Sequence, residues 1–261
     1  MKLFSYKKIF YFLIFFTTVL SITSCATKKS VLYFQDAENI NLRKLNYSNS
    51  KIQTDDIINI KVTALNEESV APYNIENGLS PSTSFIEILK LQGYLVSKEG
   101  DIVFPIIGKI NVVDKTTSEL ENYIKTILID GNHVIDPTVS VRLLNSKFTI
   151  LGEVNKAGTY TITENNITLL QAIGYAGDLT INGSRKDVLI IRSIDGLQKT
   201  KKIDLTKTDW FNSEFYFIKQ NDVIVINPNS NKIKSSGFLG SAGALMSAIS
   251  LVLTSILIVI N

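Results

Sequence analysis

The feature that most constrains this chain is its last stretch, residues 237–260, which holds 24 residues and no charged side chain. As a helix rising about 1.5 Å per residue, this stretch would be about 36 Å long. That length exceeds the roughly 30 Å hydrocarbon thickness of a bilayer. The sequence therefore predicts a C-terminal membrane-spanning helix over 237–260, joined to the preceding residues by a linker at 229–236.

Small residues recur at steps of three or four along this stretch, so on a helix they would form one narrow stripe. The stripe consists of Ser236, Gly240, Gly243, Ser247, Ser250 and Thr254. Large apolar residues such as Leu245 and Ile249 fall on the opposite side. A single anchor helix has no need of a small face, whereas a helix that packs against its own copies does. We interpret the stripe as either a helix-packing face or the lining of a lumen.

The N-terminal end of the chain also carries a membrane signal. Three lysines precede an apolar run at 9–20, and small residues follow it, as in a secretory signal peptide. Residues 22–25, Ile-Thr-Ser-Cys, resemble the lipobox of bacterial lipoproteins. We therefore predict a signal peptide at 1–24 and lipidation of Cys25, the only cysteine. Two or more acyl chains anchor a protein stably, and by bacterial sorting rules the absence of Asp after Cys25 favours the outer membrane.

Charge and composition exclude several classes of function. The net charge of +3 falls to zero once residues 1–24, with three lysines and no acid, are removed. A neutral mature chain offers no basic patch, so no nucleic-acid partner is expected. With a single histidine, a multi-histidine metal site is also excluded.

Between the two ends, a polar tether at 25–48 is followed by a first module at 49–145. Ile58, Ile60 and Val62 alternate with polar residues, as in a half-buried strand. Residues 66–84 are polar and contain Pro and Gly, so they predict a long loop. Residues 93–105 predict a hairpin with its turn at 98–101, followed by a short strand at 108–113.

The strongest helix signal of this module is a capping box. Thr116 is placed to cap the helix and Glu119 to reach back to it. Gly131 is placed to end the helix, and an alternating strand follows at 136–143. One helix among short strands predicts an α+β module.

A second module at 146–228 shows the same kinds of pattern, namely short strands and one capped helix. A strand–turn–strand pattern covers 148–162, and Thr168 with Gln171 forms a second candidate capping box. The short helix that follows would end at Ala176-Gly177. Two apolar runs at 188–192 and 222–226 predict further strands.

The order of these motifs resembles a known family. Asp56 before the first strand, GYLVSKEGDIVFPIIGKI at 93–110, TTSELENYI at 116–124 and DPTVSV at 136–141 are similar to the polysaccharide biosynthesis/export domain. The family usually has Pro-Gly-Asp where this chain has Thr54-Asp55-Asp56. GEV at 152–154, TLLQAIGYAG at 168–177 and NDVIVINP at 221–228 resemble the soluble-ligand-binding β-grasp (SLBB) domain. The fold expected is α+β, with the export and SLBB domains in tandem.

Beside these motifs, the sequence shows no recognisable set of catalytic residues. His133 lies in a turn between helix and strand, where a solvated histidine is expected. Asp55 and Asp56 are adjacent, and neighbours on a strand face opposite sides, so they would not converge as an acid/base pair. No phosphate-binding glycine array or nucleophile elbow occurs. We predict no catalytic residue, no cofactor, no metal and no enzyme activity.

Two functions remain open at this point. The resemblance implies an outer-membrane lipoprotein with its soluble domains in the periplasm, forming a homo-oligomeric ring that passively conducts capsular polysaccharide or exopolysaccharide to the exterior. It also implies an inner-membrane polysaccharide co-polymerase, often with a tyrosine autokinase, as partner. The alternative is a non-conducting periplasmic adaptor that docks on a separate outer-membrane β-barrel.

Overall fold

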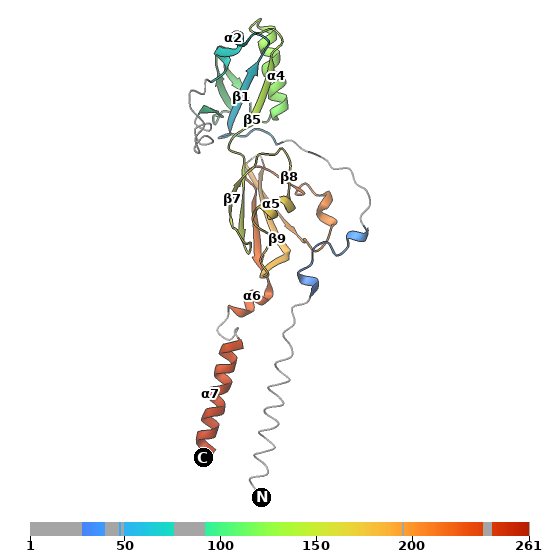
Figure 1. Ribbon diagram of the computed structural model, residues 1–261, viewed down its shortest axis with the longest axis vertical. Coiled ribbons are helices and arrows are strands. Elements are labelled where there is room, and N and C mark those ends of the chain that lie inside the picture. Colours follow the sequence, from blue (N-terminus) through green and yellow to red (C-terminus); the bar gives the residue numbers. More distant parts are fainter. Residues whose placement is uncertain are drawn as a thin grey trace.

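The computed structural model describes residues 28–39, 47, 50–75, 92–194, 196–236 and 242–260. Two modules follow one another along the long axis, and helix α7 (Ala242–Ile260) stands beyond the second module (Figure 1). Each module has its own cluster of buried apolar side chains. The fold is α+β with two modules in tandem, as the sequence predicts.

The first module is a three-stranded antiparallel sheet with a helix packed against it. The strand order is β2-β1-β5, with β1 at Ile57–Thr63, β2 at Tyr94–Leu95 and β5 at Thr138–Leu143. Helix α4 (Thr117–Asp130) buries Leu120, Ile124 and Leu128. Ile58, Ile60 and Val62 on β1 are buried, which confirms the predicted alternation.

The predicted hairpin at 93–105 is wrong. Strand β2 pairs with β1, whereas β3 (Asp101–Phe104) pairs with β4 (Gly108–Asn111). The predicted turn itself is present, because the Gly100 amide donates to the Ser97 carbonyl at 3.0 Å. The paired strands, however, are β3 and β4, which are joined by a second turn at 105–107. The alternation of the strands was visible in the sequence, but the pairing is set by which strand edges lie close in space. Part of the predicted loop at 66–84 is also helical, because α2 (Glu67–Val70) and η3 (Ala71–Tyr73) lie there.

Both predicted capping boxes are confirmed. The Thr116 hydroxyl accepts from the Glu119 amide, and the Glu119 carboxylate accepts from the Thr116 amide at 2.8 Å. In the second module Thr168 and Gln171 make the same reciprocal pair at the start of α5 (Leu169–Tyr175). These caps satisfy amides that would otherwise lack partners at the helix starts.

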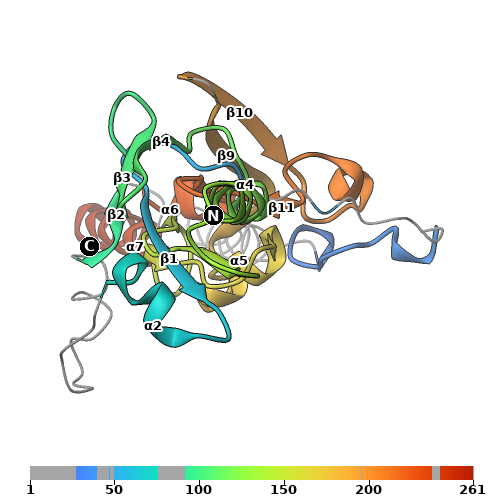
Figure 2. The same cartoon turned by 90° about the horizontal axis from the view of Figure 1, so that it is seen from above.

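The second module is built on a five-stranded sheet in the order β10-β9-β12-β6-β7. Its strands are β6 (Lys147–Gly152), β7 (Gly158–Thr161), β9 (Gly183–Ile194), β10 (Leu197–Ile203) and β12 (Val223–Pro228). Strands β6 and β12 run parallel, whereas the other pairs are antiparallel. A small second sheet pairs β8 (Ile167–Thr168) with β11 (Phe217–Ile218) beside α5. Seen from above, β10 lies at the periphery of the molecule (Figure 2).

A buried ion pair joins the elements of the second module. The Arg192 guanidinium donates to both carboxylate oxygens of Asp222, at 2.9 and 2.6 Å. It also donates to the carbonyls of Glu214 and Phe217, each at 2.8 Å. The side chains of Arg192 and Asp222 are 1% and 0% exposed. The Arg192 side chain on β9 therefore holds in place Asp222 just before β12, strand β11 and the segment before β11.

Helix α7 lies within the stretch 237–260 for which the sequence predicts a spanning helix. It covers 242–260, which at about 1.5 Å per residue is about 28 Å. Residues 237–241 lie outside the described part of the chain. Among the residues that the structure describes, no helix combines the length and the apolar character needed to cross a bilayer. The predicted linker at 229–236 holds a helix of its own, α6 (Ser230–Ser235).

Replacing Arg192 tests the ion pair. We expect Arg192→Leu to destabilise the second module by about 3–5 kcal/mol, because Asp222 would be left buried without its counter-charge. Lys199→Ala is the matched control, since the Lys199–Glu214 pair is about half exposed and is expected to contribute less than about 1 kcal/mol. Urea unfolding of both variants measures the difference, and equal losses would contradict the assigned role of Arg192.

Candidate functional site

The second module makes two sets of contacts that bear on function, one at each end. At one end it meets the first module, and we call this contact the joint; it comprises Gln53, Asp56, Asn145, Gln220 and Asn221. At the other end it holds the N-terminal residues Lys28–Asn39, which we call the strap. Figure 1 shows the strap in blue beside the second module, far from α2 at the opposite end.

Asp56 is the centre of the joint. Its carboxylate is 2% exposed, and it accepts a hydrogen bond from the side-chain amide of Gln220, which is itself 6% exposed. The second carboxylate oxygen accepts from the Gln53 amide at 2.8 Å. Asn221 Nδ2 donates to Gln53 Oε1 at 3.4 Å, adding a second contact between the modules. The two modules are therefore joined by buried polar groups.

Asn145 holds the backbone on which Asp56 sits. Its Oδ1 accepts from the Ile57 amide and its Nδ2 donates to the Asp55 carbonyl, both at 2.9 Å. Asp55 adopts a left-handed conformation, with φ at 66°. This conformation favours glycine, and aspartate is among the few other residues that tolerate it. Asp55 thus adopts the left-handed conformation needed in the turn that presents Asp56.

The environment of Asp56 penalises its charge. Burial raises the pKa of the Asp56 carboxyl, and the hydrogen bonds from Gln53 and Gln220 offset only part of this increase. Gln220 Oε1 is also buried and has no hydrogen-bond partner among the described residues. A buried polar network with an unsatisfied atom costs free energy, so this part of the joint lowers the stability of the folded state.

The strap adds two backbone hydrogen bonds to the second module. The amides of Phe34 and Gln35 donate to the carbonyls of Leu205 and Thr206, at 3.2 and 2.8 Å. The Phe34 ring lies 5.4 Å from that of Phe211, centroid to centroid. In Figure 2 the blue strap likewise lies beside the orange segment that contains η4 (Asp209–Asn212). The strap is thus fastened by both backbone and ring contacts.

The strap and the residue that follows β12 are fastened to the same segment, residues 178–185. The Tyr33 hydroxyl donates to Asp178 at 2.5 Å, and its ring lies 5.5 Å from the Arg185 guanidinium. Burial and the bond to Asp178 raise the pKa of Tyr33, so the hydroxyl stays protonated as the donor.

The C-terminal end reaches this segment through Asn229. The Asn229 backbone amide donates to the Asn182 carbonyl at 2.7 Å, and its side chain donates to the Ile181 carbonyl at 2.9 Å. Asn229 also caps α6 by accepting from the Lys232 amide. The strap and the start of α6 therefore leave the module at one pole, opposite the joint.

The predicted stripe of small residues is only partly within the described residues. Gly243, Ser247, Ser250 and Thr254 are exposed positions of α7, and Ser236 caps the end of α6. Gly240 and Cys25 lie outside the described residues.

The hydroxyl groups of this stripe are largely satisfied within the helices that carry them. Ser247 donates to the Gly243 carbonyl at 2.9 Å, and Thr254 donates to the Ser250 carbonyl at 2.7 Å. Ser236 donates to the Ile233 carbonyl at 2.7 Å. Back-bonded hydroxyls have less hydrogen-bonding capacity to offer a passing ligand.

Sequence reasoning missed the joint. Asp56 was considered as part of the family resemblance and as half of a carboxylate pair, not as a contact between modules, and Gln220 was not singled out. No group of three or more histidine, cysteine, aspartate or glutamate residues in the described ranges is arranged to hold a metal ion. His133 is exposed in the turn after α4, as expected for a solvated loop residue.

Each of the two modules matches a known protein family. Residues 45–144 match the family described as polysaccharide biosynthesis/export protein, and residues 146–226 match the SLBB domain. The chain therefore belongs to the polysaccharide biosynthesis/export proteins that carry an SLBB domain. The proteins of this family are components of transport systems and not enzymes, as the sequence analysis predicted.

Two curated relatives carry the same printed name, EPS I polysaccharide export outer membrane protein EpsA. The protein from Ralstonia solanacearum is 32% identical over 137 residues, which are 50% of this chain and 35% of the relative. That from Ralstonia nicotianae is 34% identical over 106 residues, which are 39% of this chain and 27% of the relative. The matches thus span about a third of the length of these relatives.

The joint predicts a stability effect for Asp56. Asp56→Ala would leave the Gln53 amide and the Gln220 side chain without an acceptor, so we expect a loss of about 1–3 kcal/mol. Asp55→Asn is the control, because Asp55 is exposed and asparagine tolerates its left-handed conformation. Urea unfolding should show a change below about 0.5 kcal/mol for the control. A loss from Asp55→Asn as large as that from Asp56→Ala would contradict the assignment.

The raised pKa of Asp56 also predicts a pH dependence. A carboxyl whose pKa is raised on folding favours the folded state below its unfolded pKa of about 3.9, and this advantage is lost as pH rises through the folded-state pKa. Asp56→Asn removes the titration while keeping the shape. The stability of the unsubstituted chain relative to Asp56→Asn should therefore fall as pH rises from about 4 and then level off. A difference that does not change with pH would show that Asp56 is not desolvated.

Proposed function

We propose that this chain is a lipid-anchored subunit of an outer-membrane translocon that passively conducts capsular polysaccharide or exopolysaccharide from periplasm to exterior. The family and the printed names of the relatives support the export role and the outer membrane. The observation that carries the proposal is that the strap and α6 leave the second module at one pole.

This arrangement gives the subunit an orientation. Cys25 precedes Lys28 by three residues, which span at most about 11 Å of chain. Acyl chains on Cys25 would therefore hold the 178–185 segment close to the membrane surface. The joint, at the opposite end of the second module, then holds the export domain away from the membrane, towards the periplasm.

Helix α7 lies at the same pole and supports assembly with other copies. Met246, Leu251 and Val252 are exposed on it, at 67%, 68% and 58%. We propose that copies of α7 pack together through Gly243, Ser247, Ser250 and Thr254, continuing the stripe that begins at Ser236 and Gly240. Small residues allow close approach of helix backbones, which favours such packing.

The driving force for transport is assigned to a partner. The sequence contains no nucleotide-binding glycine array, so the proposed conduction is passive. We propose that the export domain faces an inner-membrane polysaccharide co-polymerase with a tyrosine autokinase, which would supply the polymer and the energy. The polysaccharide itself is the substrate.

Replacing Cys25 tests the anchor. We expect Cys25→Ser to leave the precursor uncleaved, to abolish incorporation of labelled fatty acid and to reduce surface polysaccharide to the level of a deletion strain. Ser24→Ala is the matched control, because it keeps a small residue before the cysteine and should behave as the parent. Normal maturation and labelling of Cys25→Ser would place the anchor elsewhere.

Conductance separates the translocon from an adaptor. The purified homo-oligomer should conduct ions when reconstituted into planar lipid bilayers. If the oligomer does not conduct ions, and conductance is instead found with a separate co-purifying outer-membrane protein, the conducting role is refuted and the chain is an adaptor.

A further inference from the structure

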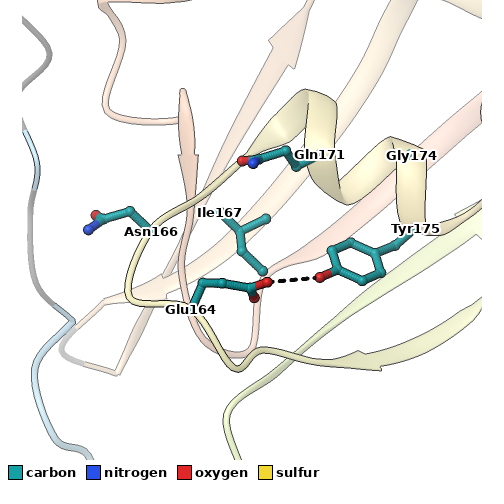
Figure 3. Close-up of a pocket in the computed structure, with 6 residues that line it drawn as sticks. All are labelled: Glu164, Asn166, Ile167, Gln171, Gly174 and Tyr175. Carbon is teal, nitrogen blue, oxygen red and sulfur yellow. Dashed lines mark hydrogen bonds between the residues drawn. The ribbon is translucent and has the colours of Figure 1, made fainter.

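A cavity in the second module is lined by none of the residues of the joint or the strap. Its volume is about 380 Å³, and it is lined by Glu164, Asn166, Ile167, Gln171, Gly174 and Tyr175. The lining comes from the β7–β8 loop, from β8 and from one side of α5 (Figure 3). This volume is within the range of small-molecule sites, about 300–1,000 Å³.

Gly174 is the first indication that the cavity binds a ligand. Glycine inside a helix is less stable than alanine by roughly 0.5–1 kcal/mol. A Cβ atom at Gly174 would meet no heavy atom within 4 Å, so packing within the protein does not require glycine there. Its φ is also not in the left-handed region. Glycine at this position leaves open a surface that any longer side chain would fill.

Tyr175 gives the cavity a fixed aromatic wall. Its ring lies 6.1 Å from the rings of Phe148 and Tyr160, centroid to centroid. Its hydroxyl donates to the Glu164 carboxylate at 3.2 Å, as drawn in Figure 3. Neighbouring rings and this hydrogen bond hold the ring in place, while 44% of the residue remains exposed.

The polar groups of the lining are mainly acceptors. Glu164 is ionised, because hydrogen bonds from its own backbone amide and from the Thr163 hydroxyl lower the pKa of its carboxyl. Gln171 Oε1 is engaged in capping α5 by accepting from Thr168, which leaves its NH₂ group as the polar donor. None of the six lining residues carries a positive charge.

We propose that this cavity binds an uncharged, hydroxyl-rich sugar unit of the transported polymer, an inference that rests on the proposed export function. The half-exposed Tyr175 ring provides an apolar surface for a sugar ring. Glu164 accepts from sugar hydroxyls, and the Gln171 amide donates to one. The ionised Glu164, with no cation beside it in the lining, disfavours acidic sugars such as uronates.

Filling the cavity without disturbing the fold gives a sharp test. Gly174→Leu introduces a side chain into open space, and leucine is a good helix former. Gly174→Ala is the matched control, because it makes the same helix-stabilising change with little added volume. Both variants should unfold in urea at or above the midpoint of the unsubstituted chain.

Binding is measured by saturation-transfer NMR on the full-length mature chain in detergent, with cellotetraose as the neutral probe and tetragalacturonate as the acidic probe. We expect saturable binding of cellotetraose in the millimolar range to the unsubstituted chain and to Gly174→Ala, and at least about a tenfold loss in Gly174→Leu. Glu164→Gln should improve the binding of tetragalacturonate. Equal binding of cellotetraose by Gly174→Leu, tighter binding of the acidic probe by the unsubstituted chain, or no saturable signal from cellotetraose overturns the sugar site.

A complementation assay keeps this outcome separate from the proposed export function. A chain that fails the binding test but restores surface polysaccharide to a deletion strain overturns the sugar site alone. A chain that binds cellotetraose as expected, but whose deletion leaves surface polysaccharide unchanged, overturns the export function.

Discussion

The buried ion pair between Arg192 and Asp222 is the interaction on which the arrangement of this protein depends. Both side chains are almost fully removed from solvent, and the guanidinium also binds two backbone carbonyls. Asp222 in turn accepts from the Lys219 amide at 2.8 Å, which fixes the turn between β11 and β12. That turn carries Gln220, the residue that reaches Asp56 in the first module. The charge pair inside the second module therefore helps to position the turn from which Gln220 reaches the first module.

A polar joint has different consequences from an apolar one. Hydrogen bonds depend on angle as well as distance, so those made to a buried carboxylate restrict the orientation of their partners. Asp56 and Gln220 thus favour one angle between the modules, at the cost of a desolvated carboxyl and a buried amide oxygen without a partner. In a subunit proposed to assemble with its copies, a fixed angle allows both modules to meet their neighbours at once.

The elements that sequence patterns predicted well are those held by local chemistry. The helices begin at Thr116 and Thr168 because a side chain three residues later completes each cap, and both partners lie within one turn. Pairing of strands was harder to predict, because β2 and β3 pair with different partners although they are close in the chain. The strand β10 was missed, since all but its last residue are exposed and it shows no apolar alternation.

The sequence by itself determined the α+β class, the order of the two modules, the family and the apolar character of the C-terminal stretch. These depend on residue type and spacing, which are properties of the chain alone. Only the tertiary structure brought Asp56 to Gln220, which are 164 residues apart, and fastened Tyr33 and Asn229 to one segment. Contacts between distant residues leave no periodic signal in either partner, because each is satisfied only when the folded modules meet.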